Sequence, residues 1–388
     1  MRNLLANSVL ISVLLLSNAA RSDNAVLPAP IHAQELSRTQ LVAAARAGGD
    51  YLVRMQKPDG SFHYYYDAAT DRFEPRRYNI VRHAGTALSL LDLYAATRDG
   101  RYLESSRRAI KFLKTRLRSA RSTRAVYLLD YDAKAKLGAN GLALAALARQ
   151  IQLDRRFADR RNATRLANLI LALQRKDGSF EMRYGLQSAD DQAFESLYYP
   201  GEALLGLIRL FKLNGDQRLH KAARRGAGFL IESQRRMDTL PADAWLMQAL
   251  GDLYEAGPQK LYAGHAIALA ESMIAEQYDD NDRADYAGGF GPGPPRATPA
   301  ASRAEGLVSA YRLARSTGDA RASKIAIALK ACARFQLAQQ FTVENSGSLP
   351  NPARARGGFR EGLTSPRIRI DFVQHNISSL LGIAEALY

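Results

Sequence analysis

Six short polar clusters recur along this 388-residue chain, each where an apolar, Ala/Leu-rich stretch of helical periodicity begins. They read YNIVRHAG from Tyr78, GANG from Gly138, YYPGEAL from Tyr198, DAWLMQAL from Asp243, SRAEGL from Ser302 and RIDFVQHN from Arg369. Each interval between clusters holds two helical patterns, so the polar start falls on every second helix. If these helices form the inner ring of a barrel, their polar starts meet at one mouth.

The apolar periodicity predicts twelve helices in six pairs, over residues 38–388. The first helix of each pair carries charge and is expected to face solvent: 38–56, 102–118, 157–174, 217–234, 259–277 and 320–341. The second is almost wholly apolar and must be enclosed: 80–97, 139–152, 200–213, 241–255, 301–316 and 370–387. This alternation predicts an all-α fold, an (α/α)6 toroid of six helical hairpins that forms a single domain over residues 34–388. An open solenoid is the alternative, but its repeats are usually shorter.

Net charge and cysteine content restrict the partners and the site chemistry. The net charge of +16 favours an acidic polysaccharide or another polyanionic envelope polymer, although an Arg-rich composition alone is an equal explanation. No nucleic-acid-binding motif is recognisable, and no nucleic-acid partner is expected. Cys332 is the only cysteine, and the six histidines show no ligand spacing, so we expect no metal and no other cofactor.

Two turns share almost the same sequence. QKPDGSF follows Met55 and QRKDGSF follows Leu173, and Asp-Gly favours a tight turn that lets the following Phe pack back against the helix ends. The Q-x-x-D-G-S-F pattern resembles the Gln-to-aromatic motif of the terpenoid cyclase and prenyltransferase α/α toroids. In this chain it indicates a structural corner.

The overall plan resembles the six-hairpin carbohydrate-active enzymes, which include glycosidases, polysaccharide lyases, sugar 2-epimerases and the helical domain of glucuronyl C5-epimerases. SRAEGLVSAYRLARSTGD from Ser302 and RIDFVQHNISSLLGIAEAL from Arg369 are similar to the last inner helices of that epimerase domain. The resemblance covers the architecture over most of the chain. It carries no family catalytic residue over to this sequence.

Six residues near the polar helix starts are candidates for proton transfer. Histidine is the usual acid/base group at physiological pH, and buried carboxyl groups and phenols can also serve. Asp371 precedes His375 by one helical turn and could orient its ring. The candidate catalytic residues are His83, Tyr199, Glu202, Glu305, Asp371 and His375. The structural alternatives are helix capping for the histidines and complementing the helix dipole for the two glutamates.

A second set of six residues is suited to binding an acidic sugar. Guanidinium groups bind carboxylates with two parallel hydrogen bonds, and the ring of the only tryptophan can stack on a sugar. The candidates are Arg82, Asn140, Trp245, Arg303, Arg360 and Arg369. We further expect the segment from Gly357 to close the ring and to bring Arg360, Arg369, Asp371 and His375 into one cleft with Arg82 and His83.

These features predict an exported carbohydrate-active enzyme acting on a uronate-type polysaccharide by C5 proton abstraction, as an epimerase or a lyase. A glycoside hydrolase with a Glu/Asp acid–base pair is the first alternative. A non-catalytic envelope polysaccharide-binding or assembly protein is the second, because the same basic mouth would serve binding alone.

Residues 1–33 have the pattern of a secretory signal peptide and leader. Arg2 precedes an apolar run from Leu4 to Leu16, which is short for a membrane span of roughly 20 residues, and small residues follow at Ala19 and Ala20. Export to the periplasm or the medium is expected, with no transmembrane segment after removal of the signal.

Expression of the full chain in a bacterium tests this expectation. N-terminal sequencing of the exported protein should find a cut after one of the alanines between positions 19 and 33. Deletion of residues 4–16 should keep the protein in the cytoplasm. An uncut chain in the membrane fraction would indicate an anchor instead of a cleaved signal.

Overall fold

The computed structural model describes residues 35–75, 78–121, 124–154, 156, 159–185, 193–279, 281 and 283–388. The predicted signal peptide lies outside these described residues. Within them, no helix is both long enough and apolar enough to cross a membrane.

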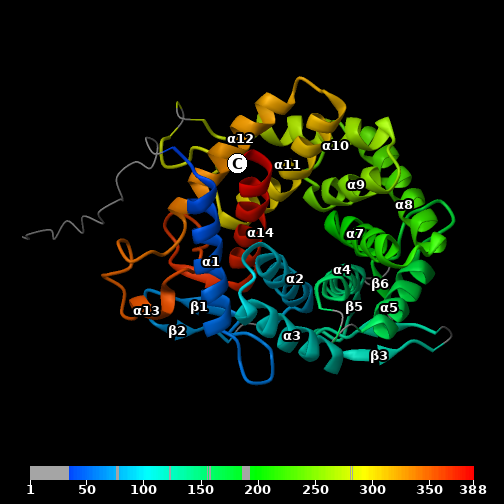
Figure 1. Ribbon diagram of the computed structural model, residues 1–388, viewed down its shortest axis with the longest axis horizontal. Coiled ribbons are helices and arrows are strands. Elements are labelled where there is room, and N and C mark those ends of the chain that lie inside the picture. Colours follow the sequence, from blue (N-terminus) through cyan, green and yellow to red (C-terminus); the bar gives the residue numbers. More distant parts are fainter. Residues whose placement is uncertain are drawn as a thin grey trace, which may run out of the picture.

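Six inner helices form a closed ring (Figure 1). Each packs against the next in chain order, and the last packs against the first. They are α2 (Ile80–Thr97), α4 (Leu137–Leu153), α7 (Tyr198–Asn214), α9 (Ala244–Ala256), α11 (Ala297–Thr317) and α14 (Ile370–Leu387). Most residues of these helices are buried, as their continuous apolar sequence requires.

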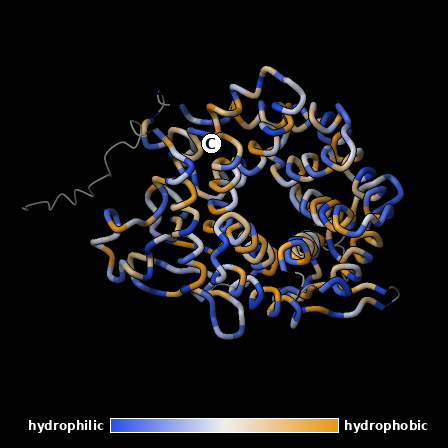
Figure 2. Tube along the Cα trace, in the orientation of Figure 1, coloured by the Kyte–Doolittle hydropathy of each residue, from blue (hydrophilic) through white to orange (hydrophobic). Residues whose placement is uncertain are grey.

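Six outer helices surround this ring, and most of them cover the seam between two inner helices. They are α1 (Arg38–Arg54), α3 (Gly100–Thr115), α5 (Arg160–Leu173), α8 (Gln217–Arg235), α10 (Lys260–Ala275) and α12 (Ala322–Ala338). Hydrophilic residues are frequent along the outer helices and loops, whereas the inner helices are largely apolar (Figure 2). The predicted (α/α)6 toroid is therefore confirmed.

Side chains just before two inner helices fix where those helices begin. Asn79 accepts a hydrogen bond from the backbone N–H of Arg82, and Asp243 accepts one from Leu246 at the start of α9. The start of α11 lies four residues before the predicted position 301, because Pro299 fits the first turn of a helix, where its missing N–H has no intrahelical partner to lose.

Short strands on the connections into the inner helices were not predicted. One sheet joins β1 (Tyr65–Asp67) to β2 (Arg72–Phe73) and to β7 (Arg367–Arg369). The other strands form two pairs, β3 (Leu117–Ser119) with β4 (Val126–Leu128) and β5 (Ala135–Lys136) with β6 (Arg183–Tyr184), and a short helix, α13, spans Pro352–Ala355. Strands of two or three residues give no alternation for a sequence pattern to detect. The pairing of β1 with β7 joins the first hairpin to the last.

A glutamine follows α1, α5, α10 and α12 and ties each of these outer helices to the next outer helix beside it. Its backbone forms an isolated bridge with a phenylalanine, in the pairs Gln56–Phe62, Gln174–Phe180, Gln277–Phe290 and Gln340–Phe359. The side-chain Nε2 donates to a glycine carbonyl of the turn and to a carbonyl of the neighbouring outer helix, whose acceptors are Ser105, Ala222, Ala328 and Ala44. The sequence revealed two of these four corners.

The glycine of each corner has a positive φ, and Gly178 has a φ of 100°. A Cβ at Gly178 would lie 2.5 Å from the backbone oxygen of Arg225, so the turn also needs the missing side chain for its close approach to α8.

We expect Gly178→Ala to destabilise the protein more than Gly215→Ala does. Gly215 also has a positive φ, of 70°, but open space surrounds its Cβ position, so it controls for backbone strain alone. The clash at Gly178 should add at least ~1 kcal/mol to a strain cost of about 1 kcal/mol. Urea denaturation followed by circular dichroism measures both. Equal losses would show that the close approach at the corner contributes nothing.

Candidate active site

The polar core of the toroid is a carboxylate–imidazole cluster at the centre of the inner ring. The Nδ1 of His375 on α14 lies 3.0 Å from Oε2 of Glu305 on α11. The ring of Trp245 on α9 lies 5.8 Å from the imidazole, and Glu202 on α7 is close enough to interact with it electrostatically. Glu202, Glu305 and His375 are all buried. Three inner helices therefore bring three predicted catalytic residues together.

Burial changes the proton affinity of all three groups. Burial raises the pKa of Glu202 to about 8, with His375 acting in the opposite direction. It also raises the pKa of Glu305, although the ion pair with His375 opposes the rise. Burial by itself lowers the pKa of His375, but the surrounding carboxylates, Glu305 first, raise it above the ordinary value. The raised pKa of Glu202 favours its protonated form at neutral pH, and Glu305 and His375 titrate as a coupled pair.

One carboxyl oxygen of Glu202 lies in space that a glycine of the neighbouring helix leaves open. Glu202 Oε2 is buried and has no hydrogen-bond partner among the described residues. A Cβ at Gly138 on α4 would lie 2.0 Å from this oxygen. The glycine in the GANG cluster therefore makes the room for the carboxyl group.

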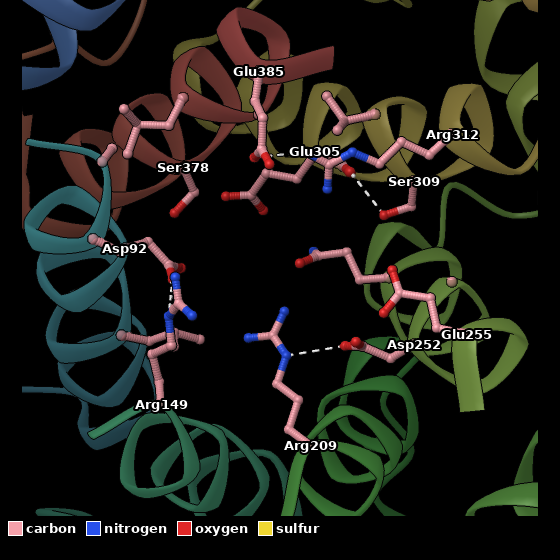
Figure 3. Close-up of a pocket in the computed structure, with 18 of the residues that line it drawn as sticks. Asp92, Arg149, Arg209, Asp252, Glu255, Glu305, Ser309, Arg312, Ser378 and Glu385 are labelled. Carbon is pink, nitrogen blue, oxygen red and sulfur yellow. Dashed lines mark hydrogen bonds and ion pairs between the residues drawn. The ribbon is translucent and has the colours of Figure 1, made fainter. Parts of the chain in front are cut away.

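A cavity of about 940 Å³ reaches this cluster from the C-terminal halves of the inner helices. Trp245, Glu305 and Gln374 line its inner end, and the charged residues of its walls point inward (Figure 3). The sequence predicted a site among the starts of the inner helices. The structure instead places this cavity on the other side of the cluster, where the inner helices end.

Ion pairs between neighbouring inner helices form the walls of the cavity. Arg149 Nε lies 2.8 Å from Asp92, Arg209 Nε lies 3.0 Å from Asp252, and Arg312 Nη2 lies 2.8 Å from Glu385. The sequence analysis did not identify these ion pairs. Their signal was present, because each of these residues is a charged residue in the second half of an otherwise apolar helix.

A second polar cluster lies at the start of α14. Asp371 is buried and accepts hydrogen bonds from Arg82 Nε at 3.0 Å and from Arg369 Nη2 at 2.9 Å. Arg82 also donates to the Tyr64 hydroxyl at 2.6 Å. Arg82, Arg369 and Asp371 thus meet as predicted. Asp371 does not hold the His375 ring, however, because Glu305 takes that position.

His83 lies apart from the cluster, in contrast to the expectation of a shared cleft with His375. Its Nε2 donates to the carbonyl of Ala109 at 2.9 Å, and its Nδ1 accepts from the Tyr78 hydroxyl at 2.7 Å. Burial lowers its pKa to about 4. The neutral ring packs on Phe62 of the first corner, so its observed role is structural.

The remaining predicted residues also have identifiable places. Asn140 accepts from the backbone of Leu128 and donates to the carbonyl of Lys136, so it joins β4 to α4. Arg360 is held by the carbonyl of Ala338. Arg303 pairs with Glu276 and lies over the Phe290 ring. None of these residues lines the cavity.

Tyr199 adjoins Glu202 but not the cavity. Burial, reinforced by Glu202 and Asp130, raises the pKa of its phenol to about 12, and its ring packs beside Gly138. It is therefore protonated at neutral pH.

A further buried hydrogen-bond chain was not recognised in the sequence. His265 Nε2 donates to Gln234, whose amide donates to Asp243 at 3.0 Å. Burial raises the pKa of Asp243 to about 7, and Asp243 in turn raises that of Glu202. In the part of the chain that the structure describes, no group of three His, Cys, Asp or Glu residues could hold a metal ion.

Three solved structures with the same fold have names of enzymes that act on sugars. A cellobiose 2-epimerase from Bacillus thermoamylovorans superposes with a TM-score of 0.68 at 12% identity, over 89% of this chain and 99% of that one. A D-mannose isomerase gives a TM-score of 0.66 at 13% identity, over 90% and 97% of the two chains. An α-1,6-mannanase from Salegentibacter sp. gives 0.65 at 12% identity, over 89% and 99%. Family models and curated proteins gave no match to the sequence. At this identity the likeness establishes the toroid fold.

We expect the stability difference between Glu202→Gln and the wild type to depend on pH. Glu202 holds its proton in the folded protein until about pH 8, whereas its ordinary pKa is 4.5. Between these values the folded state binds the extra proton, so the wild type loses about 1 kcal/mol of unfolding free energy per pH unit as pH rises. Glutamine does not titrate and escapes this loss.

Urea denaturation at pH 5, 6.5 and 8 measures the effect. The free energy of unfolding of Glu202→Gln, relative to that of the wild type, should rise steadily from pH 5 to pH 8. The exposed Glu195→Gln is the matched control and should show no such trend. A difference that stays constant with pH would mean that Glu202 is ionised in the folded protein.

Proposed function

We propose that this protein is a carbohydrate-active enzyme that removes the C5 proton of a uronate-type sugar, as an epimerase or a lyase. The observation that carries the proposal is the position of Glu305. It is a buried carboxyl group of raised pKa that faces a cavity of about 940 Å³ and is paired with His375 behind it. A base works best when its pKa lies close to the working pH, and burial moves Glu305 in that direction.

His375 and Glu202 influence the protonation of Glu305 from the side away from the cavity. His375 holds Glu305 in place and compensates its charge when it is ionised. Glu202, protonated at neutral pH, interacts electrostatically with the same imidazole. Proton uptake by Glu305 is thereby coupled to two neighbouring groups, while Trp245 at the same end of the cavity offers a face for the sugar ring.

The neighbours of the fold support a sugar as substrate. Their names describe epimerisation of cellobiose, isomerisation of D-mannose and cleavage of α-1,6-mannan. Epimerisation changes the configuration at one sugar carbon, as does the first of the two reactions that we assign to Glu305. Export of the protein, predicted from residues 1–33, would expose it to envelope or extracellular polysaccharides.

Glycoside hydrolysis is the second candidate, and a specific pair of residues favours it. Asp92 lines the same cavity as Glu305, and the two carboxyl groups interact electrostatically. Glu305 would then protonate the leaving oxygen, and Asp92 would act from the opposite side. Arg149 Nε lies 2.8 Å from the carboxyl group of Asp92 and holds it in position at the cavity wall.

Incubation with uronate oligosaccharides in deuterated water tests the proposal. We expect deuterium at C5, with an epimerised sugar or an unsaturated end as product. Glu305→Gln should lower the rate at least ~100-fold, the usual size of a general-base effect. His375→Gln should lower the rate and shift its pH profile, and Glu195→Gln on the surface should match the wild type.

The other possible products separate the remaining functions. New reducing ends without deuterium at C5 would show that the enzyme hydrolyses its substrate and does not abstract the C5 proton. Bound oligosaccharide with no product of any kind would contradict an enzyme and leave a binding protein.

A further inference from the structure

Arg209 directs its guanidinium group into the cavity. Only its Nε is engaged among the described residues, with Asp252 at 3.0 Å, and its two terminal nitrogens point into the open space (Figure 3). The side chain is 27% exposed, although it belongs to an inner helix of the toroid. Arg149, by contrast, donates to Gln152 at 2.6 Å as well as to Asp92, and Arg312 uses a terminal nitrogen for its ion pair with Glu385.

The same cavity holds a buried amide that is also unsatisfied. Gln248 lines the cavity from α9, and its Nε2 is buried with no partner in the described part of the chain. Such a donor carries a desolvation cost until a ligand or a water accepts from it. Two sets of donors on neighbouring helices thus lack an acceptor in one cavity.

The lining carboxyl groups of the cavity all have partners. Four of them, Asp92, Asp252, Glu255 and Glu385, are ion-paired with arginine or lysine. The fifth, Glu305, contacts the imidazole of His375 at 3.0 Å. An anionic ligand therefore meets the cationic side chains of the lining without facing a carboxyl group that lacks a partner.

We propose that Arg209 is the residue that recognises the carboxylate of the sugar, and that the acidic sugar enters between the C-terminal ends of the inner helices. A planar guanidinium with both terminal nitrogens available matches a carboxylate by two parallel hydrogen bonds. This inference rests on the proposed function for the identity of the ligand as a sugar. It adds the residue that selects an acidic sugar over a neutral one.

The position of Arg209 relative to Glu305 fits the chemistry of C5. The carboxyl carbon of a uronate is bonded directly to C5, so the group that binds the carboxylate must lie near the base. Arg209 and Glu305 interact electrostatically across the cavity. When the C5–H bond breaks, the proton passes to Glu305 and the electron pair is delocalised into the carboxylate, where Arg209 stabilises the added charge. Delivery of a proton from the solvent to the other face gives the epimer. Departure of the 4-O substituent, whose oxygen takes a proton from the solvent, gives the unsaturated product.

Calorimetric titration with two disaccharides tests the assignment without requiring turnover. Cellobiuronic acid and cellobiose differ only by a carboxylate in place of a hydroxymethyl group. The wild type should bind the acid at least tenfold more tightly at pH 7 and low salt. Arg209→Lys, which keeps the charge but loses the fork, and Arg209→Gln should both reduce that preference to less than threefold.

Folding of the variants is favoured because Asp252 keeps Lys212 as a partner, at 2.7 Å. Arg107→Lys alters an outer-helix ion pair with Asp154, away from the cavity, and controls for the substitution itself. The Arg107→Lys variant should keep the wild-type preference for cellobiuronic acid over cellobiose. Thermal unfolding of each variant verifies that the fold is retained.

The outcomes separate the two proposals. Equal affinity of the wild type for both disaccharides, or a preference that survives in both Arg209 variants, would overturn the carboxylate site while leaving proton transfer on a neutral sugar possible. Tight binding of the acid that depends on Arg209, without deuterium exchange, would support the site and contradict the proposed reaction.

Discussion

The closed ring depends on one recurring contact, made by the side-chain amide of a glutamine at the end of an outer helix. The described chain has four such glutamines, and the Nε2 of each joins its own turn to the neighbouring outer helix. The last of them, Gln340, reaches Ala44 of the first outer helix at 2.8 Å and so connects the two ends of the chain. These bonds are buried or half-buried and fixed in direction. They define the angle between successive hairpins more strictly than apolar packing alone can.

Closure of the ring has a direct electrostatic consequence at its centre. Six enclosed helices remove water from any polar group that points inward, so the carboxyl groups there are pushed toward their protonated forms. Glu202, Glu305 and Asp243 all show this shift, and His375 compensates only one of them by direct contact. Where the inner helices end, the charges are instead matched in pairs and the interior stays polar. The toroid therefore holds buried carboxyl groups of raised pKa beside a polar cavity.

The sequence was sufficient for the fold and for several members of the buried polar cluster. Apolar periodicity located twelve helices, because each long helix repeats the same signal many times. Glu202, Glu305, Trp245 and His375, which the structure brings together, were candidates because they are polar or aromatic residues at the starts of apolar stretches. The ends of the helices carry the same kind of signal, yet single residues such as Arg209 there resemble ordinary surface charges. Which neighbour each one meets depends on the crossing of helices far apart in sequence.

His83 and Asn140 show the opposite error. Both stand in the same sequence context as the residues of the cluster, but they point toward neighbouring strands and outer helices, and backbone groups satisfy them. Helical phase decides this, and a change of one residue in the start of a helix rotates a side chain by about 100°. The position of the cavity could not be predicted from the sequence either, because it depends on how completely side chains fill each end of the ring of inner helices.

A crystal structure of the Glu305→Gln variant with cellobiuronic acid is the most direct measurement of the central claim, that Glu305 faces the substrate from the inner end of the cavity. Our account predicts that the sugar packs against Trp245, with C5 in contact with the side chain at position 305. A sugar bound instead among the loops around Arg82 and Asp371, out of reach of position 305, would contradict it.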